Sequence, residues 1–155
     1  MKKIIYTLPS GGLAVVHPVI NTFPKREDIT EDQALDRAMK KLPADAIDPR
    51  VVDESAIPTD RTFRNAWKAG GGGIEHDMEK AREIHRDRLR VTRAPLLAAL
   101  DVAYQRADEA GDASAKKVIA EKKQALRDAT RDPVIDAAAD VGALKAAIPA
   151  VLAAA

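Results

Sequence analysis

The residues of this chain that could carry out acid–base or metal chemistry match no known site in their spacing: the 24 carboxylates are too many to single out a catalytic dyad, and only three histidines accompany them. The histidines are His17, His76 and His85, and the last two lack the His-Glu-x-x-His spacing that holds zinc on a helix face. No phosphate-binding loop, nucleophile elbow or dinucleotide-binding glycine pattern occurs, and cysteine is absent. We therefore expect no metal, no cofactor and no catalysis.

The most charged segment, residues 79–93, could instead contact an anionic partner. Its arginines recur at helical spacing and define one stripe: Arg82, Arg86, Arg90 and Arg93. A stripe of acids runs beside them: Glu79, Glu83 and Asp87. Each acid has an arginine three residues on, so the favoured interpretation is a solvated helix face whose charges pair with one another. The alternative is a basic ridge that binds phosphate or an acidic protein.

The overall charge weighs against nucleic acid as the partner of that ridge. The chain carries 25 basic and 24 acidic side chains, a net charge of +1, whereas duplex-binding proteins need a basic excess to neutralise phosphates. Hydrophobic residues make up 46%, which is typical of a globular chain. The turn residues 9–12 interrupt the apolar start, and no run approaches the ~20 apolar residues of a membrane span, so we expect neither secretion nor membrane insertion.

The first half has the pattern of a small ββαβ unit. In chain order we expect strands over 3–8 and 13–19, a helix over 30–42 and a third strand over 50–53. Pro9 to Gly12 has the composition of a hairpin turn. Thr30 and Gln33 have the spacing of a capping box, which predicts the start of the helix.

Two of the five aromatic residues follow the third strand. Pro58 to Asp60 resembles a helix start, and Phe63 and Trp67 would then lie four residues apart on one side of a helical turn. One interpretation is that they anchor this short helix on the core. The other is that they form an anchor for a partner protein, because tryptophan is enriched in binding hot spots.

Four consecutive glycines, Gly70 to Gly73, predict a flexible joint between two halves. We expect an α+β fold, with an α+β unit over residues 1–69, a glycine-rich linker over 70–76 and a mainly helical part over 77–155.

The second half predicts an antiparallel helical hairpin. A core-facing stripe recurs at helical spacing, with Leu97 and Tyr104 beside it: Leu96, Leu100, Ala103 and Ala107. Pro95 either kinks one long helix or begins a second one. Gly111 and Asp112 should end one helix and cap the next, over about 113–130. Its inward face would contain Val118, Ile119, the stem of Lys122, Ala125, Leu126 and Ala129. Shorter helices should follow from Asp132-Pro133 and over 141–153.

Three motifs of this half resemble one family. They are Arg86-Asp87-Arg88-Leu89, then Leu97 through Asp101, then Lys123-Gln124-Ala125-Leu126-Arg127-Asp128 with Pro133 shortly after. Over residues 78–135 this pattern resembles the C-terminal region of small phage and prophage tail-region proteins, among them tail fibre assembly chaperones. The start, Ile4-Ile5-Tyr6 with a glycine turn and Val15-Val16, also looks like the short β start of such proteins.

The resemblance implies a non-enzymatic protein of a phage or prophage tail, in the virion or the host cytoplasm. It would be a structural component or an assembly helper that binds a tail or fibre protein, and self-association as a dimer or trimer stays open. We expect the partner-binding residues to be Phe63, Trp67, Arg82, Arg86, Arg90, Arg93 and Tyr104. The alternative function is a cytoplasmic adaptor or regulator that binds nucleic acid through the four arginines.

Overall fold

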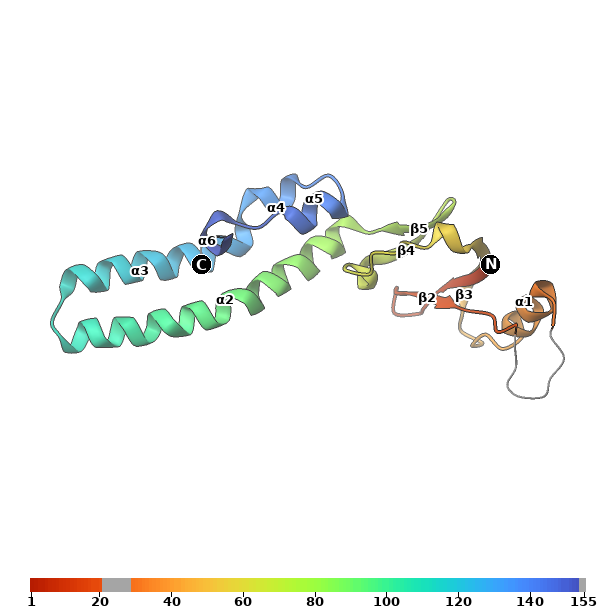
Figure 1. Ribbon diagram of the computed structural model, residues 1–155, viewed down its shortest axis with the longest axis horizontal. Coiled ribbons are helices and arrows are strands. Elements are labelled where there is room, and N and C mark those ends of the chain that lie inside the picture. The colour runs from red at the N-terminus through yellow and green to blue at the C-terminus, as the bar shows by residue number, and fades with distance from the viewer. Residues whose placement is uncertain (21–28, 154–155) are drawn as a thin grey trace. The chain divides into compact units, whose positions relative to one another are not determined.

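The computed structural model describes residues 1–20 and 29–153, which form two compact units divided after Asp77. The first unit, Met1–Asp77, holds two antiparallel sheets and one α-helix, and the second, from Met78, is helical (Figure 1). The expected α+β class is therefore confirmed. Each unit is described below by itself.

The larger sheet of the first unit has three antiparallel strands in the order β2-β1-β3. They are β1 (Lys2–Thr7), β2 (Leu13–Val16) and β3 (Ile47–Asp53). The central strand β1 is covered on both faces, because the consecutive Ile4 and Ile5 are both buried. The expected hairpin between β1 and β2 is present, and Ile5 pairs with Val15 across it.

The helix α1 (Glu31–Met39) begins where its sequence predicts. The Thr30 hydroxyl accepts from the Gln33 amide at 3.3 Å, and the Gln33 side chain accepts from the Thr30 amide at 3.1 Å. This reciprocal pair satisfies two amides that the first turn leaves without intrahelical partners. The helix ends at Met39, three residues before the expected boundary, with Ala34 and Leu35 on its buried side.

The expected helix after Pro58 is not formed. Only one 3₁₀ turn, η2 (Arg64–Ala66), is present, after an earlier one, η1 (Glu54–Ala56). Trp67 then begins a strand, β4 (Trp67–Gly70), which pairs with β5 (Gly73–His76). The four-residue spacing of Phe63 and Trp67 is compatible with a helix. However, the backbone of Trp67 pairs with His76 across the second hairpin, which satisfies its hydrogen bonds in a strand instead.

The glycine run is a hairpin turn, so the prediction of a flexible linker is wrong. Gly70 pairs with Gly73 across the hairpin, and Gly71 and Gly72 form its two-residue loop. Gly73 is buried with φ of 155°, and a β-carbon there would lie 2.7 Å from that of Ala56. Glycine is therefore required at residue 73 by close backbone approach rather than by flexibility.

The second hairpin packs on the first sheet to complete the core of this unit. Ile5, Leu13 and Trp67 are buried together. Their cluster is extended by half-buried side chains of both sheets and of the segments between them: Val15, Val52, Ile57, Ala69 and Ile74. The unit thus contains two more strands than the expected ββαβ pattern.

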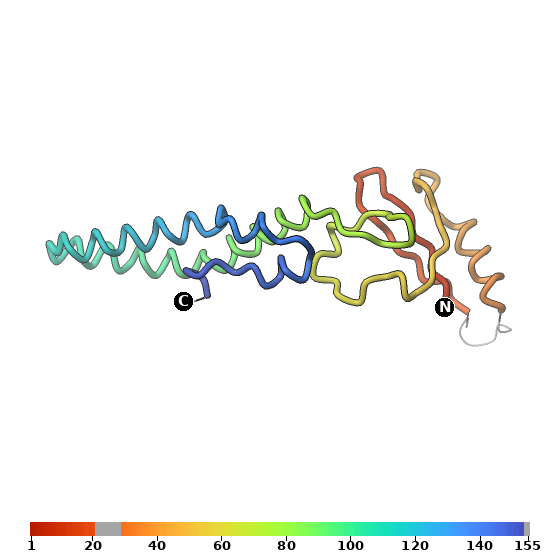
Figure 2. Tube along the Cα trace, turned by 90° about the horizontal axis from the view of Figure 1, so that it is seen from above, coloured from red at the N-terminus to blue at the C-terminus, as the bar shows by residue number. Residues whose placement is uncertain are grey.

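The second unit is the expected helical hairpin. The helices α2 (Met78–Glu109) and α3 (Ala113–Asp128) run side by side, as both views show (Figures 1 and 2). Pro95 lies inside α2, which continues as one helix through it. Gly111 has φ of 69°, and the amides of Gly111 and Asp112 donate to Asp108 and Ala107. This pair of bonds closes α2 as a Schellman motif, and the Asp112 carboxylate then caps α3.

The inward face of α3 lies about one residue away from the expected one. Ile119, Leu126 and Ala129 are covered as predicted, but Val118, Lys122 and Ala125 are exposed. Lys123 lies inward instead of Lys122, because its ammonium forms an ion pair with Asp101 at 2.5 Å across the hairpin.

After α3 the chain folds back in short helical pieces along the N-terminal part of α2. They are η3 (Ala129–Arg131), α4 (Pro133–Ala137), α5 (Val141–Ala146) and α6 (Ala150–Ala153). The expected helix over 141–153 is thus two helices, separated around the buried Pro149. We call residues 78–93 with 126–153 the base of this unit, and residues 94–125 its tip.

Candidate functional site

Phe63 and Trp67, expected as partner-binding residues, lie in the interior. Their exposed fractions are 3% and 2%. The indole of Trp67 donates to His76 Nε2 at 3.1 Å, and the two rings meet edge to face. Burial with a satisfied polar atom is the arrangement of a core anchor. The interpretation as core residues therefore agrees with the structure, and the interpretation as a docking surface does not.

The first two arginines of the charged segment bind the C-terminal part of the chain. Arg82 Nη2 donates to the carbonyl of Ala138 at 3.0 Å. Arg86 Nε donates to the carbonyl of Thr130 at 3.2 Å, and its Nη2 forms an ion pair with Asp136 at 2.6 Å. The expected pairs of these arginines with Glu79 and Glu83 are not formed, although all four residues are described.

Arg93 binds the end of α3, where backbone carbonyls have no intrahelical partner. Its Nη1 lies 3.2 Å from the carbonyl oxygen of Leu126 and 2.6 Å from that of Arg127. A guanidinium at a helix C-terminus satisfies these acceptors and opposes the negative end of the helix dipole. Only Arg90 keeps the expected pairing, with Asp87.

These contacts correct the interpretation of the arginine stripe. Three of its four members act inside the base, where they link α2 to the end of α3 and to α4. The sequence places these arginines on one helix face but does not show which groups they bind. Their acceptors are mostly backbone carbonyls that lie 33 to 56 residues away in the chain.

A buried histidine is a second feature of the base that sequence reasoning did not interpret. His85 is 6% exposed, and its Nε2 lies 2.9 Å from the carbonyl oxygen of Ala147. The signal was available, because Ala81, His85 and Leu89 recur every four residues and all three are buried. His85 thus belongs to the packed face of α2.

The tip is held by two ion pairs and a thin apolar seam. Asp101 pairs with Lys123, and Asp108 pairs with Lys116 at 2.7 Å. The hydrogen bond that Lys116 donates to Asp108, followed by the charge of that carboxylate, raises the pKa of Lys116. Of the predicted apolar seam only Ala107 is buried, at 9% exposed, whereas its other members are half-buried: Leu96, Leu97, Leu100 and Ala103.

Tyr104, also expected to bind a partner, lies at the edge of this seam. Its side chain is 37% exposed, and the ammonium of Lys123 lies 5.3 Å from its ring centroid. Among the expected partner-binding residues, Tyr104 and Arg90 are the two exposed ones, whereas Arg82, Arg86 and Arg93 are half-buried.

An apolar stripe on the opposite side of α2 was missed. Val91, Pro95, Ala98 and Val102 are spaced by four, three and four residues, which places them on one helix face. Val91 is 75% exposed and Val102 49% exposed. We call these four residues the outer face of α2. The 4-3-4 spacing is readable from the sequence, but the leucine stripe on the other side of the helix is the stronger apolar signal.

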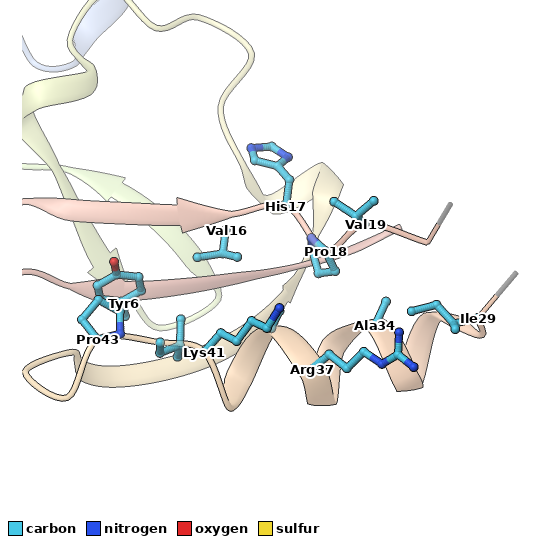
Figure 3. Close-up of a pocket in the computed structure, with 12 residues that line it drawn as sticks. Tyr6, Val16, His17, Pro18, Val19, Ile29, Ala34, Arg37, Lys41 and Pro43 are labelled. Carbon is cyan, nitrogen blue, oxygen red and sulfur yellow. The ribbon is translucent and has the colours of Figure 1, made fainter. Parts of the chain in front are cut away.

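The first unit contains a separate hollow of about 410 Å³ beside α1. Tyr6, Val16 and Pro18 line it from the sheet side (Figure 3). Arg37 of α1 and Lys41, which lies two residues after the end of α1, line the other side. Its floor is apolar and its rim is basic. We assign it no ligand.

Within residues 1–20 and 29–153, no three histidine, aspartate or glutamate side chains are placed to hold a metal ion. No helix in the same residues has the length and apolarity that crossing a bilayer requires.

Comparison with known proteins supplies no relative. No family model, no curated protein and no solved structure matches this chain.

Proposed function

We propose that this chain is a tail-associated protein of a phage or prophage that acts by protein–protein recognition and catalyses no reaction. The family proposal rests on the motifs between residues 78 and 135, and recognition rests on the surface of the second unit. The protein would act in the virion as a structural component, or in the host cytoplasm as a helper that binds a tail or fibre protein during assembly.

The observation that carries the recognition proposal is the outer face of α2. Isolated apolar side chains are common on protein surfaces, but a row at helical spacing on an exposed helix is typical of a contact surface. Val91 and Val102 are among the most exposed large apolar side chains of the second unit. The exposed Ala94, Ala98 and Ala99 lie between them.

The small residues in the middle of this face favour a helical partner. Alanine lets a second backbone approach closely, and valines at the two ends can then pack into its grooves. Asp87 and Asp101 border one side of the face, and Arg106 borders the other, as the helical spacing places them. A partner helix with small residues in its centre and opposite charges at its edges would fit. A second copy of this chain offers the same pattern.

Nucleic-acid binding through the arginine stripe has less support. Duplex recognition needs guanidinium groups that are free to neutralise phosphates. Arg82, Arg86 and Arg93 already donate to carbonyl or carboxylate oxygens of the base. Binding of DNA phosphates by these three side chains would compete with their contacts inside the base.

Mass spectrometry of purified phage particles and of assembly intermediates tests the function. We expect the chain in the particles if it is a structural component, or only in complexes with a tail or fibre protein if it is a helper. Absence from both would contradict the proposal.

A double substitution tests the surface. Val91→Lys with Val102→Lys should abolish binding to the tail or fibre protein, and also any dimer or trimer seen by analytical ultracentrifugation. Val118→Lys is the matched control, because Val118 is 50% exposed but lies on α3. Equal losses from both changes would contradict a role for the outer face of α2.

A further inference from the structure

The base contains a polar hollow that includes three of the expected arginines but that the proposed recognition surface does not account for. Its volume is about 670 Å³, and it lies between α2 and the end of α3. Five arginines line it, three from α2 and two from the α3 end: Arg86, Arg90, Arg93, Arg127 and Arg131. The other lining residues are polar or acidic: Gln124, Asp128, Thr130 and Asp136.

The hollow concentrates positive charge. Five arginines face two aspartates, a surplus of three charges in one site, although the whole chain has a net charge of only +1. Both carboxylates are already engaged, because Asp136 accepts from Arg86 and Asp128 accepts from Gln124 at 2.9 Å. The aspartates therefore offset part of the charge without filling the site.

Two guanidinium groups at the α3 side are available to a ligand. Arg127 and Arg131 are four residues apart, on adjacent turns, and the guanidinium of neither forms a hydrogen bond or ion pair with any described residue, although the backbone carbonyl of Arg127 accepts from Arg93. Each guanidinium carries five donors in a planar fork that matches the oxygens of phosphate or carboxylate. Side chains without protein partners at the edge of a basic hollow are suited to bind an anion.

The opposite wall of the hollow is held in place. Arg86 and Arg93 are anchored on the carbonyls of Thr130 and Arg127, and these bonds use only some of their donors. Their charge also offsets the negative dipole end of α3, which would otherwise repel an anion. An oxyanion in the hollow would thus lie between the anchored guanidinium groups of Arg86 and Arg93 on α2 and the guanidinium groups of Arg127 and Arg131 at the end of α3 and in η3.

We propose that this hollow binds a small dianionic oxyanion of the phosphate class, with Arg127 and Arg131 as the direct ligands and Arg90 beside them. This is a ligand site separate from the outer face of α2. A free phosphate and a phosphate monoester share the same chemistry, and a binding experiment with both distinguishes them.

Isothermal titration calorimetry of the full chain, which measures the heat of ligand binding, tests this proposal. Inorganic phosphate, a nucleoside monophosphate and chloride are titrated at matched ionic strength. We expect saturable binding of at least one phosphate species and none of chloride. The double variant Arg127→Gln with Arg131→Gln should bind at least tenfold more weakly. The variant Arg131→Gln alone should show a smaller loss, which keeps the test usable if the double variant does not fold.

A control with equal charge loss separates a site from general screening. Arg106→Gln with Lys122→Gln removes two exposed positive charges from the tip and should leave phosphate binding unchanged. An equal loss in this control, or no saturable binding by the wild type, would overturn the proposal. Duplex DNA that competes for the same arginines with a salt slope of several charges would also overturn it, in favour of a nucleic-acid surface.

Discussion

The base and the tip of the second unit use the same helix α2 in different ways. In the base, α2 buries Ala81, His85 and Leu89, and its arginines bind the returning chain. In the tip it packs along α3, and Ala107, 9% exposed, is the one buried residue of the seam between them. The difference indicates that the base is stabilised from within, whereas the tip presents surface that a partner could cover.

Loss of a core side chain should separate the two regions most clearly. Leu144 is fully buried in the base, so Leu144→Ala should lower the free energy of unfolding by about 2–5 kcal/mol. Leu100 is half-buried in the tip, and Leu100→Ala should cost about 1–2 kcal/mol because part of its surface already contacts water. Urea denaturation followed by circular dichroism measures both. Equal losses would contradict the division.

Removal of an inward arginine should have the next largest effect. Arg93→Ala leaves the carbonyls of Leu126 and Arg127 without their donor, at a cost of about 1–3 kcal/mol. Arg106→Ala, on the exposed side of the tip, should change stability by less than about 0.5 kcal/mol. The same denaturation experiment applies. An Arg93→Ala variant with an unchanged free energy of unfolding would mean that water replaces the guanidinium at these carbonyls without loss of stability.

The turn at the end of the tip should be sensitive to its glycine. Gly111→Ala forces a side chain into a left-handed conformation with φ of 69° and should cost about 1 kcal/mol. Gly71→Ala is the matched control, because Gly71 does not have a positive φ and a β-carbon there meets open space. Thermal unfolding should show a lower midpoint only for Gly111→Ala. A similar shift in both would indicate a general effect of losing glycine.

The smallest effect concerns pH. Asp108 raises the pKa of Lys116, so this pair stabilises the tip fully below the ordinary lysine pKa of 10.5. The stabilisation is lost as pH rises through the higher pKa of the folded state. The guanidinium–carbonyl bonds of the base do not titrate in this range, because arginine stays charged. Lysine titration by NMR should show the raised pKa in the wild type but not in Asp108→Asn.

Local signals predicted much of this fold. The capping box at Thr30, the αL glycine at Gly111 and the cap at Asp112 each need only neighbouring residues, and each formed as expected. Alternation and turn composition likewise located the first hairpin.

The errors arose where distant parts of the chain decide the structure. Gly70 to Gly73 has the composition of a linker, and only pairing of β4 with β5 and the nearness of Ala56 make it a turn. The acceptors of Arg86 and Arg93 are carbonyls, which leave no mark in a sequence. The candidate sites therefore follow from the structure more than from the motifs.

Hydrogen exchange of the full chain tests the central claim most directly. Backbone amides of helical segments exchange at rates set by the free energy of local opening. We predict that residues 81–89 of α2 are protected at least tenfold more than residues 98–107 of the same helix, and that a bound partner raises protection mainly over residues 91–107, which include the outer face. Uniform protection along α2 would contradict the account.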